Sequence, residues 1–170
     1  MVTKNAFSLI ELIVVIGLLS LLMLAISSTM LMSLVSSNRI RTTTKIKQAG
    51  NYAIGQMQSM IRSAKSVVEC KNTSDTTNPY ITLVNPDGDV TTLSSELDDA
   101  GYTHVASNSG IYLTPTNTDL GTSFSLNCEP DADAPNLVKI SFDLKESSTN
   151  TPTSHTPNLH FETSVNIRNE

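Results

Sequence analysis

A single carboxylate, Glu11, lies within a long apolar run near the start of the chain and is the only charged residue between positions 7 and 35. The run exceeds the roughly 20 apolar residues that span a bilayer. A carboxylate in a spanning helix costs about 2.5–3.5 kcal/mol at the centre and less near an interface. Two interpretations remain open. Glu11 is an interfacial group that is partly protonated or reaches headgroups, or it is an intramembrane charge whose partner belongs to another molecule.

The remaining residues offer little catalytic chemistry. The histidines are His104, His155 and His160, and the chain contains no Gly-x-Ser-x-Gly, His-Glu-x-x-His or phosphate-binding loop. The acidic runs 87–89 and 129–133 carry oxygen ligands suited to calcium. However, Asp-Gly is first a turn signal, and the second run is first a solvated loop. We therefore expect no catalytic residue, no metal and no cofactor.

The residues before the apolar run do not form an ordinary secretory signal. Only Met-Val-Thr-Lys-Asn-Ala precedes it, with one positive charge at Lys4. Secretory signals have a shorter apolar core, followed by a small-residue cleavage site. No such site follows this run, and no cysteine lies near its end.

The segment from Ala6 through Phe7-Ser8-Leu9-Ile10 to Glu11 and the apolar run beyond it resembles the processing motif of type IV prepilins and pseudopilins. The resemblance implies that a prepilin peptidase cuts between Ala6 and Phe7, that Phe7 is N-methylated, and that Glu11 pairs with the N-terminal amine of a neighbouring subunit. It also implies three kinds of partner besides the cytoplasmic membrane: other pilin or pseudopilin subunits, the peptidase and the pilus assembly platform.

Cleavage after Ala6 would place a positive amine four residues before Glu11. Opposite charges attract far more strongly in a low-dielectric helix bundle than in water. Because only one axial offset brings the amine to the carboxylate, the pair would also select register.

The sequence departs from the family at two points. Ala6 stands where the family has glycine, and the first proline is Pro79, although many major pilins carry a proline in the spanning helix. Polar Ser27, Ser28 and Thr29 occupy the region where such a break would occur. The uninterrupted helix favours a minor pilin or minor pseudopilin over the main shaft subunit.

Charge is divided sharply along the chain. Residues 36–68 carry six cations and no acid (+6), whereas residues 69–170 carry four cations and fifteen acids (−11). An acidic head argues against binding nucleic acid. The basic stripe at 39–65 is better interpreted as a solvated helix face near anionic headgroups, or facing acidic neighbouring domains, than as a DNA contact.

The cations at 39–47 outnumber Lys4, and by the positive-inside tendency they would place the C-terminus in the cytoplasm. We give more weight to the processing motif, the cysteines and the acidic polar domain, which agree on export. The expected location is the cytoplasmic membrane, single-pass with the head outside, and after assembly an extracellular or periplasmic filament.

Two cysteines, Cys70 and Cys128, lie in the polar part. An even count in an exported domain fits one disulfide closing a long loop, and the alternative is two unrelated buried thiols. No second cysteine or histidine stands at metal-ligand spacing from either. The triplet Asn72-Thr73-Ser74 matches the glycosylation spacing, a pattern that is common by chance.

The pattern of elements predicts an α+β, pilin-like fold. We expect a leader at 1–6, a hydrophobic helix at 7–35, its amphipathic continuation at 36–68 and a β-rich head at 69–170. The continuation has apolar residues three or four apart, and only Gly50 and Gly55 weaken it, by about 1 kcal/mol each. One helix over 7–68 would be about 93 Å long.

Beyond position 68, alternating apolar residues and turn signals predict short strands that form an antiparallel sheet on the C-terminal half of the helix. The expected strands are 80–84, 90–93, 110–113, 123–128, 137–144 and 159–167.

The leading functional hypothesis is a structural subunit, in the minor role, of a type IV pilus or related pseudopilus. The alternatives are a pseudopilin of a type II secretion or DNA-uptake system and a membrane-anchored, adhesin-like binding module. A tethered enzyme is disfavoured because the sequence contains no catalytic motif.

Overall fold

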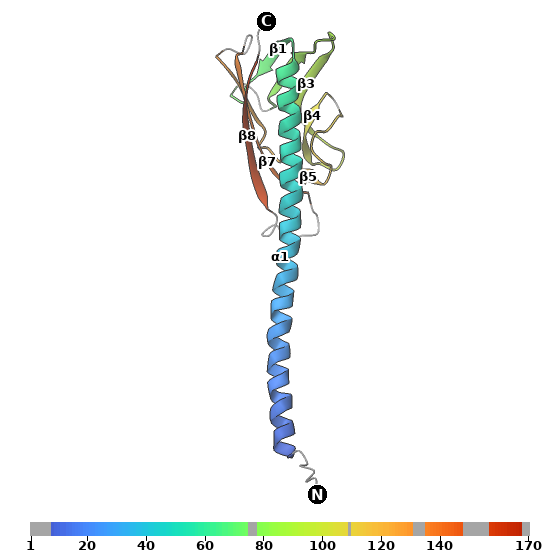
Figure 1. The fold of residues 1–170 in the computed structure, drawn as a ribbon. Helices are drawn as coiled ribbons and strands as arrows, with labels where there is room; N and C mark the ends of the chain where they lie inside the picture. The colour runs from blue at the N-terminus through green and yellow to red at the C-terminus, as the bar shows by residue number, and fades with distance from the viewer. Residues whose placement is uncertain (1–7, 75–77, 109, 131–134, 148–156, 168–170) are drawn as a thin grey trace. The chain divides into compact units, whose positions relative to one another are not determined.

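The computed structural model describes residues 8–74, 78–108, 110–130, 135–147 and 157–167. The predicted leader and its cleavage site, Ala6 and Phe7, lie outside these residues. The chain divides into two compact units, Met1–Arg41 and Thr42–Glu170. One helix and eight strands, all paired antiparallel within the described residues, confirm the α+β class (Figure 1).

The helix α1 runs from Leu9 to Ser63, so the prediction that it continues to position 68 is wrong. Ala64 still donates to the carbonyl of Met60 at 3.0 Å, but the Lys65 amide donates to the Val84 carbonyl of a neighbouring strand at 2.8 Å. The β-branched pair Val67-Val68 then favours an extended chain. The apolar residues keep their helical spacing beyond Ser63, but hydrogen bonding to the neighbouring strand holds this part of the chain extended.

Within the second unit, α1 buries a stripe formed by Ile46, Gly50, Ala53, Met57 and Ile61. The spacing of three, four and seven residues places these side chains on one face of a helix. The four apolar side chains of this stripe, those of Ile46, Ala53, Met57 and Ile61, join the hydrophobic core with residues from both sheets. The amphipathic pattern thus identified the packed face correctly, whereas Ile40, in the first unit, is 63% exposed.

The first sheet contains four strands in sequence order, β1-β2-β3-β4. Their bounds are β1 Ser66–Lys71, β2 Tyr80–Val84, β3 Val90–Leu97 and β4 Thr103–Ser107. The turn between β2 and β3 is closed by the Asn85 amide on the Asp89 carbonyl at 2.8 Å. In this sheet alternate residues such as Ile81, Leu83 and Leu93 are fully buried.

The second sheet is built on β7, Leu137–Glu146, which pairs with every other strand of the sheet. Those strands are β5 Thr118–Asp119, β6 Ser125–Glu129 and β8 Asn158–Asn166. Phe142 of β7 and Phe161 of β8 stack with ring centroids 5.5 Å apart. Phe161 also lies against α1, because a Cβ added at Gly50 would be 2.2 Å from the end of the Phe161 ring. The sequence analysis treated Gly50 as a residue that weakens the helix. The structure shows that the missing side chain leaves the space that the Phe161 ring occupies.

The predicted strand 80–84 has the same bounds as β2, and the predicted strands 90–93, 123–128, 137–144 and 159–167 correspond to β3, β6, β7 and β8 with shifted ends. The predicted strand 110–113 is wrong, because its only ladder contact among the described residues is an isolated bridge between Ala106 and Tyr112. The single expected sheet is two sheets. The sequence also missed β1, β4 and the short β5, and residues 66–68 of β1 were assigned to the helix.

Candidate functional site

The first unit exposes an unbroken apolar surface. Every large hydrophobic side chain of α1 from Leu9 to Val35 is at least 46% exposed. Exposed apolar patches of more than a few hundred Å² mark membrane or protein contacts in soluble proteins. Among the described residues, α1 is the one helix long and apolar enough to cross a membrane. This surface is the strongest functional feature of the chain.

Glu11 lies in the first turn of this helix. The Ser8 carbonyl accepts the Glu11 amide at 3.0 Å and the Leu12 amide at 3.2 Å, which places the start of the helix beside the carboxylate. An anion in the first turn is stabilised by about 0.3–1 kcal/mol through the unpaired amides of the helix start. Glu11 forms no salt bridge within the described residues. Its side chain is therefore available to a partner from outside.

Four hydroxyl groups of the apolar segment form hydrogen bonds within the helix itself. Ser20 and Ser27 donate to the carbonyls four residues earlier, each at 2.8 Å. Ser28 and Thr29 donate to the carbonyls three residues earlier, at 2.9 and 2.8 Å. Because each polar hydrogen has an internal acceptor, these residues are compatible with a hydrocarbon environment.

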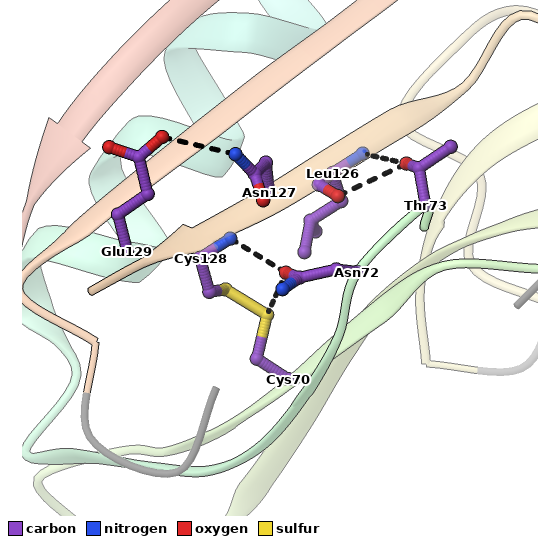
Figure 2. The surroundings of a disulfide bond; sticks show 7 residues. All are labelled: Cys70, Asn72, Thr73, Leu126, Asn127, Cys128 and Glu129. Carbon is purple, nitrogen blue, oxygen red and sulfur yellow. Dashed lines mark hydrogen bonds between the residues drawn. A yellow bond between two sulfur atoms is a disulfide. The ribbon is translucent and has the colours of Figure 1, made fainter. Parts of the chain in front are cut away.

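Cys70 of β1 and Cys128 of β6 form a disulfide bond, as the sequence predicted (Figure 2). The bond connects the two sheets, and both cysteines are at most 3% exposed. Neighbouring hydrogen bonds reinforce this connection: the Thr73 amide donates to the Leu126 carbonyl at 2.9 Å, and the Leu126 amide donates to the Thr73 hydroxyl at 2.8 Å. A covalent bond and two hydrogen bonds, one of them to a side-chain hydroxyl, thus connect the two sheets at this point.

Asn72 has a structural role beside this bond. Its side-chain oxygen accepts the Cys128 amide at 2.7 Å and lies 3.7 Å from the Cys70 sulfur (Figure 2). The side chain is half-buried. The glycosylation-like triplet is therefore better explained by this hydrogen bond.

A buried histidine forms a polar network that the sequence did not reveal. His104 is fully buried, with Nε2 3.0 Å from Asp98 Oδ2 and Nδ1 3.4 Å from Thr114 Oγ1. The Val105 amide donates to the same hydroxyl at 3.2 Å. The pKa of Asp98 is lowered, chiefly by the hydrogen bond from the Tyr102 amide. Hydrogen bonds from the His104 ring and the Ala100 amide add to this effect, and together they outweigh desolvation, which raises the pKa.

This chain of hydroxyl, imidazole and carboxylate contains the groups of a nucleophilic triad. A nucleophile must reach its substrate, however, and Thr114 is only 2% exposed. We interpret the network as a structural connection between the β3–β4 turn and the segment after β4. No local sequence signal would have found it, because the three residues lie on different segments.

Beside this network, a groove of about 570 Å³ lies between α1 and residues 112–118, and Thr114 is part of its lining. Its polar and aromatic lining includes Lys45, Gln48, Tyr52, Tyr112, Asn117 and Glu146. The Tyr112 ring lies 4.8 Å from the His104 ring, so the buried network supports one wall.

In the acidic turn 87–89, whose oxygens are of the type that binds calcium, Asp87 Oδ1 accepts a hydrogen bond from the Asp89 amide of the same turn at 3.1 Å. The described residues include no cluster of three or more potential metal ligands. Residues 131–133 of the second acidic run lie outside the described residues. Of the other histidines, His160 Nδ1 contacts Asp143 at 2.6 Å on the surface of the second sheet, and His155 lies outside the described part.

The arrangement is pilin-like: a long apolar N-terminal helix whose C-terminal part packs against antiparallel sheets. It also places a spanning-length helix and a disulfide in one chain, which indicates a membrane-associated, extracytoplasmic location. Comparisons with protein-family models, with curated protein sequences and with solved structures found no match.

Proposed function

We propose that this protein is a subunit, in a minor role, of a type IV pilus or related pseudopilus. The observation that carries the proposal is the continuous exposed apolar surface of α1 from Leu9 to Val35, with one carboxylate in its first turn. Such a surface is unstable in water and requires lipid or other helices around it. A membrane-stored subunit that transfers into a helix-packed filament would meet both environments in turn.

In this proposal the assembly site is formed by two molecules. Cleavage between Ala6 and Phe7 creates an amine, which is then N-methylated, and Glu11 of a neighbour accepts it. The charge pair forms only when the helices are in register, because helices packed in hydrocarbon offer no water to an unpaired charge. The subunit acts with other pilins or pseudopilins, a prepilin peptidase and an assembly platform, and it catalyses no reaction.

The first test concerns processing. Co-expression with a prepilin peptidase should yield a product whose N-terminal residue is a methylated Phe7, detected by mass spectrometry of the intact chain. A product that retains the leader under conditions where a known prepilin is cut would contradict the proposal.

The second test concerns assembly. Glu11→Gln keeps the size of the side chain and removes its charge, so we expect normal membrane insertion and processing but loss of incorporation into filaments. Ser20→Ala is the matched control, since it removes a polar group that is already bonded within the same helix. Equal incorporation of Glu11→Gln and wild type would refute the charge-pair mechanism.

A further inference from the structure

Four cations follow the apolar run within nine residues of α1: Arg39, Arg41, Lys45 and Lys47. No acid occurs between Leu12 and Val68 to offset them. All four residues are exposed. The segment 39–47 is therefore a block of positive charge adjoining the membrane-spanning stretch.

The lysines on the strands are paired with acids of the same chain. Lys71, Lys139 and Lys145 lie 3.4, 2.8 and 3.1 Å from carboxylate oxygens of Glu69, Glu129 and Asp119, respectively. Among the described residues, by contrast, Lys45 and Lys47 form no salt bridge. No carboxylate of the described ranges pairs with these two lysines, so their charge is available to an external anion.

The position of the block matches the depth of the headgroups. At about 1.5 Å per residue, Arg39 and Arg41 lie about 6 and 9 Å along the helix axis beyond Val35, the last residue of the apolar run. The polar layer on each side of a bilayer is about 5–8 Å thick. Lys45 and Lys47 follow within six residues of Arg41 on the same helix.

We propose that residues 39–47 bind the anionic phospholipids of the leaflet facing the head. The inference rests on insertion of α1 into a membrane and not on filament assembly. Lipid is favoured over the acidic head of a neighbouring copy because the segment adjoins the bilayer in every inserted molecule. Each basic residue near an anionic surface contributes about a fivefold factor in affinity, so the block would hold the stored subunit at a fixed depth.

The test uses the full chain reconstituted in vesicles, with insertion checked by flotation. Thr44→Cys, labelled with an environment-sensitive dye, reports on the block, and selective labelling is possible because both native cysteines are in a disulfide. Vesicles of phosphatidylcholine are compared with vesicles that also contain phosphatidylglycerol. We expect a blue shift and severalfold weaker acrylamide quenching only with the anionic lipid, both lost when salt shortens the Debye length to about 3 Å.

Two charge-matched variants decide the assignment. The variant Lys45→Gln/Lys47→Gln should reach half of the maximal blue shift only at a severalfold higher fraction of anionic lipid than the parent needs. Arg62→Gln/Lys65→Gln, which removes the same charge farther along the chain, should respond like the parent. The inference is overturned by an equal response in pure phosphatidylcholine, by equal loss in both variants, or by a response that follows protein density at fixed lipid composition. The last result would assign the block to a neighbour's acidic head.

Discussion

Reduction of the Cys70–Cys128 disulfide should destabilise the head by about 4 kcal/mol. The bond closes a loop with a sequence separation of 58 residues. The chain-entropy model assigns about 14 cal/mol/K to a loop of that length, which is about 4 kcal/mol at room temperature. The hydrogen bonds between Thr73 and Leu126 do not involve the cysteines, so we expect them to persist after reduction and the loss to come from the denatured state.

The assay is urea unfolding of the full chain in detergent micelles, followed by tyrosine fluorescence. All four tyrosines lie within residues 42–170, so the signal reports the head while the apolar helix stays in the micelle. We expect a lower midpoint for the reduced protein and a steeper urea dependence, because the unclosed denatured chain exposes more surface.

Cys70→Ala/Cys128→Ala, measured with and without reductant, controls for effects of the reductant itself. A loss below about 1 kcal/mol with an unchanged slope would refute the argument that the bond acts by restricting the unfolded chain.

Two further predictions concern Gly50 of α1 and Asp98 of the β3–β4 turn. Gly50→Ala should lower the free energy of unfolding by about 1–3 kcal/mol, because its Cβ would meet the Phe161 ring at 2.2 Å, and denaturant unfolding measures the loss. Gly55→Ala, the matched control on the same helix with nothing within 4 Å of the added Cβ, should be neutral or stabilising by up to about 1 kcal/mol; a stability loss equal to that of Gly50→Ala would disprove the steric explanation. The folded-state pKa of Asp98 is lowered, chiefly by the Tyr102 amide, so its ionised form stabilises the head above about pH 4, and that stability is lost as pH falls through the folded pKa. In Asp98→Asn the free energy of unfolding should therefore change less between neutral and acidic pH than in the parent. If denaturant unfolding shows the same loss of stability at acidic pH in both proteins, Asp98 does not have this role.

The sequence identified the features that depend on neighbouring residues. Glu11 within an apolar run and the helical spacing of Ile46, Ala53 and Met57 are local patterns, and local patterns set membrane affinity and the buried face of a helix. Alternation likewise located the strands at 80–84 and 137–144. These predictions were accurate because the side-chain period of an element is fixed by its own backbone geometry.

The tertiary structure decided what depends on residues far apart in the chain. The helix ends at Ser63 because the next residues pair with β2, although their apolar spacing remains helical. The close approach of Phe161 to Gly50 likewise spans more than a hundred residues and leaves no local pattern. The sequence alone thus determined that a carboxylate lies in an apolar helix. Only long-range packing decided where that helix ends and which glycine it needs, because strand pairing and steric fit involve partners that no sequence window contains.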